Sequence, residues 1–211
     1  MTDIKICGIK DAESLKKTIE SGARFIGLVF YPDSSRYVEP EQARLLSRMA
    51  PTGVRMVGLF VNPDDSWLSH VLGIVPLDMI QLHGSEPTVR VAEIKSKYNL
   101  PIIKAIPLAK KEDLEKVDTY IQVADWLLFD TKSENTTDHG GTGRTFDWAI
   151  LKNRKFSKPW MLSGGLHAGN VAEALSTLQP DAVDVSSGVE SERGVKDPLK
   201  IAEFIQTVKN L

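Results

Sequence analysis

A strand-like run, Asp3-Ile4-Lys5-Ile6-Cys7, is ended by Gly8 and followed by Asp11, which can cap a helix over residues 12–20. Cys7 therefore lies at the carboxyl end of the first predicted strand. It is the only cysteine in the 211 residues, which excludes an internal disulfide and a cysteine-cluster metal site. A lone cysteine is in most proteins a small buried residue, so any chemistry must come from its neighbours.

The same unit, a strand followed by a helix, recurs about eight times, with roughly 20 to 35 residues from one strand to the next. Predicted strands cover residues 3–7, 24–30, 54–61, 79–82, 101–105, 126–129, 160–162 and 182–185. The alternation predicts an α/β fold with a parallel sheet, and about eight units favour a closed (β/α)8 TIM barrel over an open doubly wound sheet. Since no shift in composition marks a boundary, we expect a single (β/α)8 barrel domain over residues 1–211.

Composition argues against several classes of protein. Lys and Arg number 26 against 28 Asp and Glu, without a basic block, so nucleic-acid binding has little support. No apolar run approaches the roughly 20 residues of a membrane span, and the first residues do not read as a signal segment. We therefore expect a soluble, cytoplasmic protein with no nucleic-acid or membrane partner. The four histidines show no metal-ligand spacing, so we expect no metal.

Polar residues gather where the predicted strands end. In a barrel, alternate residues of each strand point inward, and active sites lie at the carboxyl ends. If Ile4 and Ile6 face the helices, Lys5 and Cys7 face the interior. The same alternation predicts that the inward set also contains Gln81, His83, Lys104, Asp130, Met161, Ser163, Asp184 and Ser186. Burying so many polar groups costs several kcal/mol unless they are paired or bind a ligand.

The first and last predicted strands each carry one charge inside the barrel, Lys5 and Asp184. Closure makes these strands neighbours, so we expect the two side chains to form a structural ion pair. A catalytic role for either residue is the alternative.

Two glycine-containing loops indicate a phosphate site. Ser163-Gly164-Gly165 follows the seventh predicted strand, and Ser186-Ser187-Gly188 follows the eighth. Backbone N–H groups in such loops bind phosphate, and the loops after strands seven and eight are the usual phosphate site of this fold. A simple tight turn is the alternative for each. The candidate phosphate-binding residues are Gly164, Gly165, Ser186, Ser187 and Gly188.

Other polar positions are candidates for substrate binding. Arg36, in the loop after the second strand, either holds a carboxylate bidentately or is a solvated surface arginine. His83 is either a substrate contact or a hydrogen-bonded structural residue. The run Gly140-Gly141-Thr142-Gly143 is a lid or backbone-contact segment that lacks the P-loop lysine, and it makes Gly141 and Gly143 candidate substrate contacts. His139 is expected to be solvated.

Short motifs are spread over nearly the whole chain. They are Lys5-Ile6-Cys7-Gly8, Ser35-Arg36-Tyr37, Leu59-Phe60-Val61-Asn62, Gln81-Leu82-His83-Gly84, Leu128-Phe129-Asp130, Gly141-Thr142-Gly143, Phe146-Asp147-Trp148, Ser163-Gly164-Gly165-Leu166, Asn170-Val171 and Asp184-Val185-Ser186-Ser187-Gly188-Val189-Glu190. In this order they closely resemble the phosphoribosylanthranilate isomerases of tryptophan biosynthesis. The pattern is looser at residues 191–194, with Arg193 where a proline is common.

The resemblance implies a (β/α)8 barrel that works as an aldose-ketose isomerase, an intramolecular oxidoreductase, without a metal or organic cofactor. It implies an Amadori rearrangement of a small-molecule substrate, phosphoribosylanthranilate. Cys7 would be the general base and Asp130 the general acid, with Arg36 on the anthranilate carboxylate. The phosphate would be held by N–H groups of Gly164, Gly165, Ser187 and Gly188.

Two other functions stay open. A sister phosphate-binding barrel isomerase of histidine biosynthesis performs the same rearrangement on another aminoaldose, but it carries an aspartate at the position of Cys7. A non-catalytic phosphate-ligand binding protein would keep the glycine loops and lose the acid and the base. We expect a monomer, with a dimer through a strand-end loop as the alternative.

Overall fold

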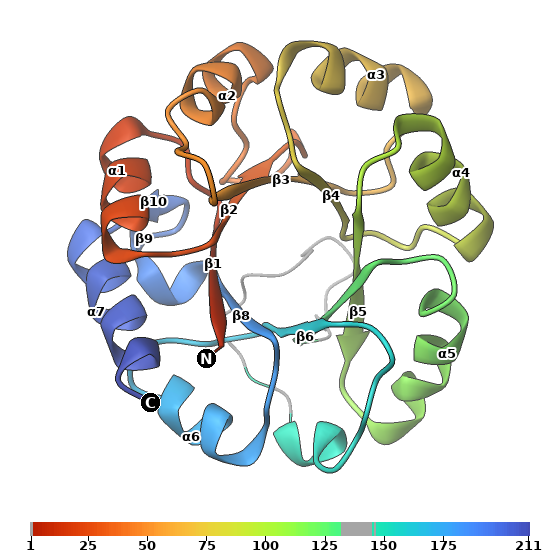
Figure 1. Ribbon diagram of the computed structural model, residues 1–211, viewed down its shortest axis with the longest axis vertical. Helices are drawn as coiled ribbons and strands as arrows, with labels where there is room; N and C mark the ends of the chain where they lie inside the picture. The colour runs from red at the N-terminus through yellow and green to blue at the C-terminus, as the bar shows by residue number, and fades with distance from the viewer. Residues whose placement is uncertain (1, 132–144, 146) are drawn as a thin grey trace.

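Eight parallel strands form a closed barrel in this computed structural model, which describes residues 2–131, 145 and 147–211 (Figure 1). The strands pair in chain order, and β1 also pairs with β8. Their bounds are β1 Asp3–Cys7, β2 Phe25–Val29, β3 Arg55–Phe60, β4 Met79–Leu82, β5 Ile102–Leu108, β6 Trp126–Thr131, β7 Trp160–Leu162 and β8 Ala182–Val185. The predicted (β/α)8 TIM barrel is confirmed.

Helices surround the ring of strands (Figure 1). The α-helices are α1 Ala12–Ser21, α2 Pro40–Ser47, α3 Asp65–Ile74, α4 Thr88–Tyr98, α5 Val117–Tyr120, α6 Val171–Thr177 and α7 Pro198–Lys209. The described residues also form the 3-10 segments η1 Lys111–Lys116, η2 Trp148–Leu151 and η3 Ser187–Val189, and a small hairpin joins β9 Glu190–Glu192 to β10 Val195–Lys196. Among the described residues, no helix has the length and apolar character that crossing a bilayer requires.

Helix α1 begins at the predicted cap. The Asp11 carboxylate accepts a hydrogen bond of 2.7 Å from the Ser14 N–H, which satisfies a donor that the first turn leaves without a partner. Gly22 ends the helix with a φ of 94°, a left-handed conformation that glycine adopts without steric cost.

The connection between β5 and β6 does not form one regular helix. The chain makes the 3-10 segment η1 and then the short helix α5. The Asp113 carboxylate accepts from the N–H groups of Ala109 and Lys110, and this local capping stabilises a tight turn. The β9–β10 hairpin had no prediction, because a two-residue strand shows no periodicity.

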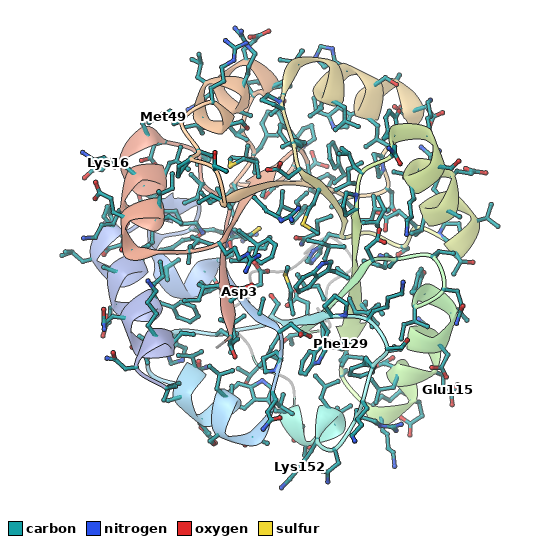
Figure 2. The ribbon with its side chains drawn as sticks, viewed as in Figure 1. Asp3, Lys16, Met49, Glu115, Phe129 and Lys152 are labelled. Atoms are coloured by element: carbon teal, nitrogen blue, oxygen red, sulfur yellow. The ribbon has the colours of Figure 1, made fainter. Side chains whose placement is uncertain are left out.

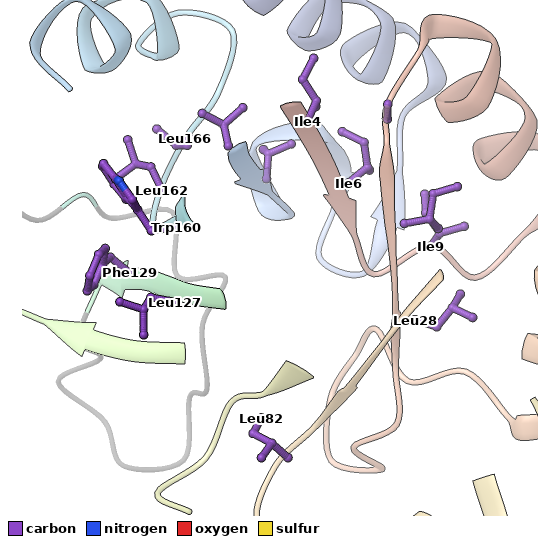
Figure 3. Close-up of a cluster of buried hydrophobic side chains, with 14 of the residues drawn as sticks. Ile4, Ile6, Ile9, Leu28, Leu82, Leu127, Phe129, Trp160, Leu162 and Leu166 are labelled. Carbon is purple, nitrogen blue, oxygen red and sulfur yellow. The ribbon is translucent and has the colours of Figure 1, made fainter. Parts of the chain in front are cut away.

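Apolar side chains pack on both faces of the barrel strands. The cluster between the strands and the helices includes Ile4, Ile6, Leu127, Phe129 and Leu162 (Figure 3). Side chains also fill the interior of the ring of strands (Figure 2). A second apolar cluster, on the inward face of the strands, includes Phe25, Val57, Met79, Leu128 and Met161. Neighbouring residues of one strand thus belong to different clusters, and the predicted outward direction of Ile4 and Ile6 is confirmed.

The predicted inward direction of Lys104 is wrong. Its neighbours Ile103 and Ala105 belong to the inner cluster, so Lys104 points toward the helices. There its Nζ donates to the Leu82, Gly84 and Ala105 carbonyls and to the Glu86 carboxylate, at 2.8 to 3.1 Å. Both faces of β5 are buried, so alternation of polar and apolar residues could not reveal the direction of this lysine.

Barrel closure places Lys5 opposite Asp184 in the β1–β8 register. Lys5 Nζ donates to Asp184 Oδ1 at 2.8 Å, and Ser163 Oγ donates to Asp184 Oδ2 at 3.1 Å. Burial lowers the pKa of Lys5, but attraction to Asp184 and to Cys7 outweighs burial and raises it, so the lysine stays charged. The predicted ion pair is confirmed.

Lys5→Met leaves the buried Asp184 carboxylate without its cation. We expect the free energy of unfolding, measured with urea at pH 7, to fall by about 3 kcal/mol. Lys16→Met is the control, because Lys16 is 72% exposed and lies 3.8 Å from Glu20, so no measurable change is expected. Unchanged stability of Lys5→Met together with lost turnover would assign Lys5 to chemistry instead.

Candidate active site

The carboxyl ends of all eight strands meet at one rim because the strands are parallel. Cys7 is the last residue of β1, His83 follows β4, and Asp130 is the next-to-last residue of β6. Ser163 follows β7 and Ser186 follows β8. Closure thus brings residues from distant parts of the chain to one end of the barrel, where this fold places its active sites.

Cys7 faces the barrel interior and is only 4% exposed. Its side chain packs with Val29 and Leu59 from the two following strands. A Cβ on Gly27, in the neighbouring strand, would lie 2.7 Å from Cys7 Sγ and 3.1 Å from Lys5 Nζ. Only a glycine at this position leaves room for the thiol beside the lysine.

The surroundings of Cys7 favour the neutral thiol in the free protein. Burial raises the pKa of Cys7, and the Asp184 carboxylate also raises it. The Lys5 and Lys196 ammonium groups lower the pKa of Cys7 but do not overcome the effect of burial. The thiol therefore keeps its proton near neutral pH until some further positive charge approaches it.

Asp130 is the second candidate reactive group at the rim, and it is 6% exposed. Its Oδ2 lies 3.0 Å from His83 Nε2, and its Oδ1 accepts a hydrogen bond of 2.8 Å from the Thr131 N–H. On the other side of the imidazole ring, His83 Nδ1 lies 2.8 Å from Gln81 Nε2. His83 is thus hydrogen-bonded in a chain that ends at Asp130.

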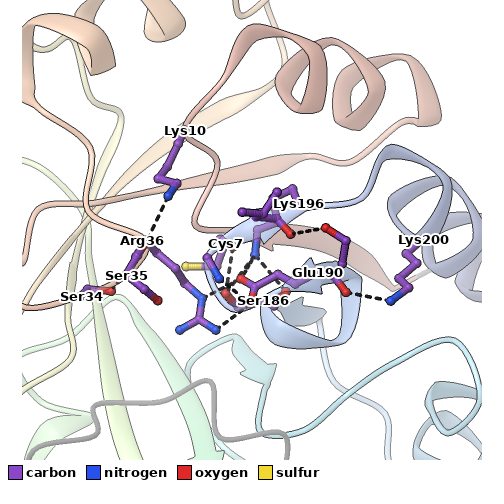
Figure 4. Close-up of polar contacts among 12 residues, drawn as sticks. Cys7, Lys10, Ser34, Ser35, Arg36, Ser186, Glu190, Lys196 and Lys200 are labelled. Atoms are coloured by element: carbon purple, nitrogen blue, oxygen red, sulfur yellow. Dashed lines mark hydrogen bonds and ion pairs between the residues drawn. The ribbon is translucent and has the colours of Figure 1, made fainter.

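Arg36 is buried, so its interpretation as a solvated surface residue is wrong (Figure 4). Its Nε and Nη2 donate to the two carboxylate oxygens of Glu190, at 2.7 and 2.9 Å. This is the bidentate geometry expected for a carboxylate partner, but the partner belongs to the protein. The opposite edge of the guanidinium, formed by Nη1 and the second Nη2 proton, has no hydrogen-bond partner among the described residues.

Lys196 lies on the other side of Glu190 (Figure 4). Its Nζ donates to Glu190 Oε1 at 2.8 Å and to the carbonyl and hydroxyl oxygens of Ser186. Burial lowers the pKa of Lys196 to about 8 although Glu190 opposes the shift. Burial raises the pKa of Glu190, but bonds to Arg36 and Lys196 outweigh it and leave the pKa lowered. The carboxylate therefore stays ionised.

The two glycine loops lie against each other. Gly164 and Gly165 have φ of 89° and 63°, and their N–H groups donate no hydrogen bond to the described residues. Ser187 and Gly188 begin η3, where the first N–H groups have no partner within the turn. A Cβ on Gly188 would meet the Leu166 carbonyl oxygen, so glycine permits this close approach. Donors from two adjacent loops suit an anion such as a phosphate.

The structure brings most of the predicted site residues to one rim. These are Cys7, Arg36, His83, Asp130, Gly164, Gly165, Ser186, Ser187 and Gly188. The predictions for Gly141, Gly143 and His139 lie outside the described residues. Sequence reasoning gave no role to Glu190 or Lys196, and the only signal was the position of Glu190 directly after the second glycine loop.

Comparisons with known proteins agree with one another. Residues 4–207 match the family model described as N-(5'-phosphoribosyl)anthranilate (PRA) isomerase. The N-(5'-phosphoribosyl)anthranilate isomerase of Rhodospirillum centenum is 49% identical over 204 residues, covering 96% of this chain and 95% of the relative. The Paracoccus denitrificans enzyme of the same name is 49% identical over 203 residues, covering 96% and 94%.

Solved structures point the same way. The phosphoribosyl anthranilate isomerase of Thermotoga maritima is 40% identical, with a TM-score of 0.90 and all of both chains covered. Another structure of such an isomerase, in complex with reduced 1-(o-carboxyphenylamino)-1-deoxyribulose 5-phosphate, is 37% identical with a TM-score of 0.86 and also covers both chains fully. This chain belongs to the N-(5'-phosphoribosyl)anthranilate isomerase family.

Proposed function

We propose that this protein catalyses the Amadori rearrangement of N-(5'-phosphoribosyl)anthranilate, with Asp130 as general acid and Cys7 as general base. One observation carries the assignment. A buried carboxyl and a buried thiol lie at the same end of the barrel, beside a buried arginine and two glycine loops whose N–H groups have no hydrogen-bond partner among the described residues. Family membership supplies the substrate, because the relatives carry this name.

Asp130 would open the sugar ring. Its carboxyl proton goes to the ring oxygen O4', the bond between C1' and O4' breaks, and the nitrogen lone pair forms a protonated Schiff base at C1'. The 6% exposure of Asp130 suits this role, because a carboxyl group shielded from water delivers its proton to the substrate instead of to solvent.

Cys7 would then remove the proton from C2'. The electrons of the C2'–H bond form the double bond between C2' and C1' and neutralise the iminium nitrogen, giving an enolamine. Protonation of C1' and loss of the hydroxyl proton at C2' complete the ketone product. The thiol must release its own proton first, and the positive charge created by ring opening favours the thiolate.

The two ends of the substrate would be held by separate groups. The N–H groups of Gly164, Gly165, Ser187 and Gly188, with Ser186 beside them, face the phosphate. The free edge of Arg36 binds the anthranilate carboxylate while Glu190 occupies its other edge. Holding both ends fixes the reacting carbons between acid and base, which can supply several kcal/mol.

The rival functions differ at the reactive groups. The histidine-pathway isomerases carry an aspartate in place of Cys7, and a binding protein needs neither Cys7 nor Asp130. A fluorescence assay that follows loss of phosphoribosylanthranilate, run beside the histidine-pathway substrate, separates all three functions. We expect turnover of the first substrate.

We also propose a cytoplasmic monomer. The larger exposed apolar side chains of the described residues are few, and Leu45, Val89, Val195 and Leu199 come from four different elements, α2, α4, β10 and α7. One solved relative from Thermotoga maritima is described as monomers made from a dimeric isomerase, so both states occur in relatives.

Cys7→Ala and Asp130→Asn test the acid and the base. We expect each to lower kcat by about 10² to 10⁴-fold with little change in substrate affinity, because each group transfers a proton in the transition state and contributes little to binding. Asp118→Asn, at an exposed position on α5, is the control and keeps full activity. Near-normal turnover in a folded Cys7→Ala or Asp130→Asn protein removes the role assigned to that residue.

Arg36→Met tests the carboxylate site. We expect KM to rise about tenfold or more with a smaller change in kcat, since a charge-assisted hydrogen bond to the substrate is lost. The exposed Arg48→Met is the matched control. Unchanged affinity of Arg36→Met in a titration with the substrate would leave Arg36 as a purely structural partner of Glu190.

Alkylation of the single cysteine tests the ionisation of Cys7. Because burial raises its pKa, we expect the rate with iodoacetamide in the free protein to rise with pH through a midpoint above the ordinary thiol value, about 8.5. A short peptide with blocked ends and one cysteine provides the reference curve. A midpoint below that of the reference would show a preformed thiolate.

A further inference from the structure

Gln81 is an amide buried inside the barrel with one hydrogen bond. It is 0% exposed, and its Nε2 lies 2.8 Å from His83 Nδ1. Its Oε1 is buried without a partner among the described residues. A buried polar atom without a partner costs free energy, so this arrangement needs an explanation.

The bond to Gln81 determines which nitrogen of His83 carries the proton. An amide NH2 group can only donate, so Nδ1 accepts and the neutral ring carries its hydrogen on Nε2. Nε2 then donates to Asp130 Oδ2 at 3.0 Å, while Oδ1 accepts from Thr131. In this arrangement His83 and Asp130 together hold one proton, and Asp130 is a carboxylate.

An acid needs one more proton in this pair. With two protons, the pair is either an imidazolium beside a carboxylate or a neutral ring beside a carboxylic acid that donates to Nε2. In both forms Nδ1 carries a hydrogen, which opposes the Gln81 NH2 group. A half turn of the amide exchanges Nε2 and Oε1 and presents an acceptor to Nδ1.

The half turn loses no other hydrogen bond. Gln81 bonds only to His83 among the described residues, so in either orientation one end of the amide has a partner and the other end has none. No second contact selects one orientation, and the protonation of the pair decides between them.

We propose that Gln81 is a positioning residue whose amide orientation is coupled to the proton count of the His83–Asp130 pair, and so sets the pH range in which Asp130 is an acid. This rests on the proposed role of Asp130. The second proton enters from water. Asp130 passes one proton to O4' of the substrate, the pair returns to one proton, and water restores the second as Cys7 gives up the proton taken from C2'.

The other charged groups near the His83–Asp130 pair keep their own partners when the pair gains or loses a proton. On the adjacent strand β5, Lys104 lies on the outer face and pairs with Glu86 at 2.9 Å. Across the interior, Lys5 and Asp184 form a closed ion pair. On β3, the residue level with Gln81 is Leu59, which is not titratable. Cys7 can also lose a proton, and its contribution to the pH profiles is identified separately by its alkylation profile.

The test compares Gln81→Glu with Gln81→Met. In the substrate-free protein, ¹⁵N NMR follows both ring nitrogens of His83 against pH, with His83→Asn to assign the signals. For the wild type we expect an unprotonated Nδ1 at high pH and a protonated one at low pH. A carboxylate at position 81 only accepts, so Gln81→Glu keeps the Nδ1 proton to a pH higher by about one unit or more.

Turnover provides the second readout. We expect the high-pH limb of kcat/KM to move up in Gln81→Glu by the same amount, and down in Gln81→Met, whose thioether is only a weak acceptor. A structural role alone would change kcat/KM equally at every pH. The exposed Gln179→Glu is the control and leaves both profiles unchanged.

Two results would overturn the inference. One is a His83 Nδ1 profile in folded Gln81→Glu that matches the wild type. The other is a shifted Nδ1 profile without a shifted limb. The NMR readout needs no substrate, so it is independent of the proposed function, which fails separately if Asp130→Asn keeps its turnover.

Discussion

The pairing of β1 with β8 is the contact on which the candidate site depends. It closes the sheet, and the buried ion pair between Lys5 and Asp184 lies inside it at 2.8 Å. Cys7 is two residues beyond Lys5 on the same face, so the register that forms the ion pair also places the thiol. The bond from Ser163 to Asp184 ties β7 to the same point. One closure therefore orients residues from three strands.

The two groups of buried charges at the rim differ in net charge. Lys5 and Asp184 cancel, whereas the cluster of Arg36, Glu190 and Lys196 has two basic groups and one carboxylate. With Lys196 protonated, that cluster has one positive charge in excess, which suits an anionic ligand. Its bonds to Glu190 also hold the long Arg36 side chain in one geometry, so less side-chain entropy is lost when a ligand binds.

Much of the site was predictable because the relevant signals are local. Cys7, Asp130 and the glycine loops each follow an apolar run directly, and in a parallel barrel all such ends meet at one rim. Two features were not predictable. Glu190 bonds an arginine 154 residues away, which no local pattern encodes. Lys104 lies in a strand that is apolar on both faces, so its direction depends on the register with β6.

The order of strands and helices, the closed barrel and the end of the barrel that carries the candidate reactive residues follow from the sequence alone, because strand ends, caps and glycine turns are properties of short segments. Folding in three dimensions was needed to show which polar groups touch: Arg36 bonds Glu190, and His83 bonds both Gln81 and Asp130. Those contacts join segments far apart in the chain. Burial in the folded barrel raises the pKa of Cys7, and folding brings the proposed acid, Asp130, within hydrogen-bond distance of His83.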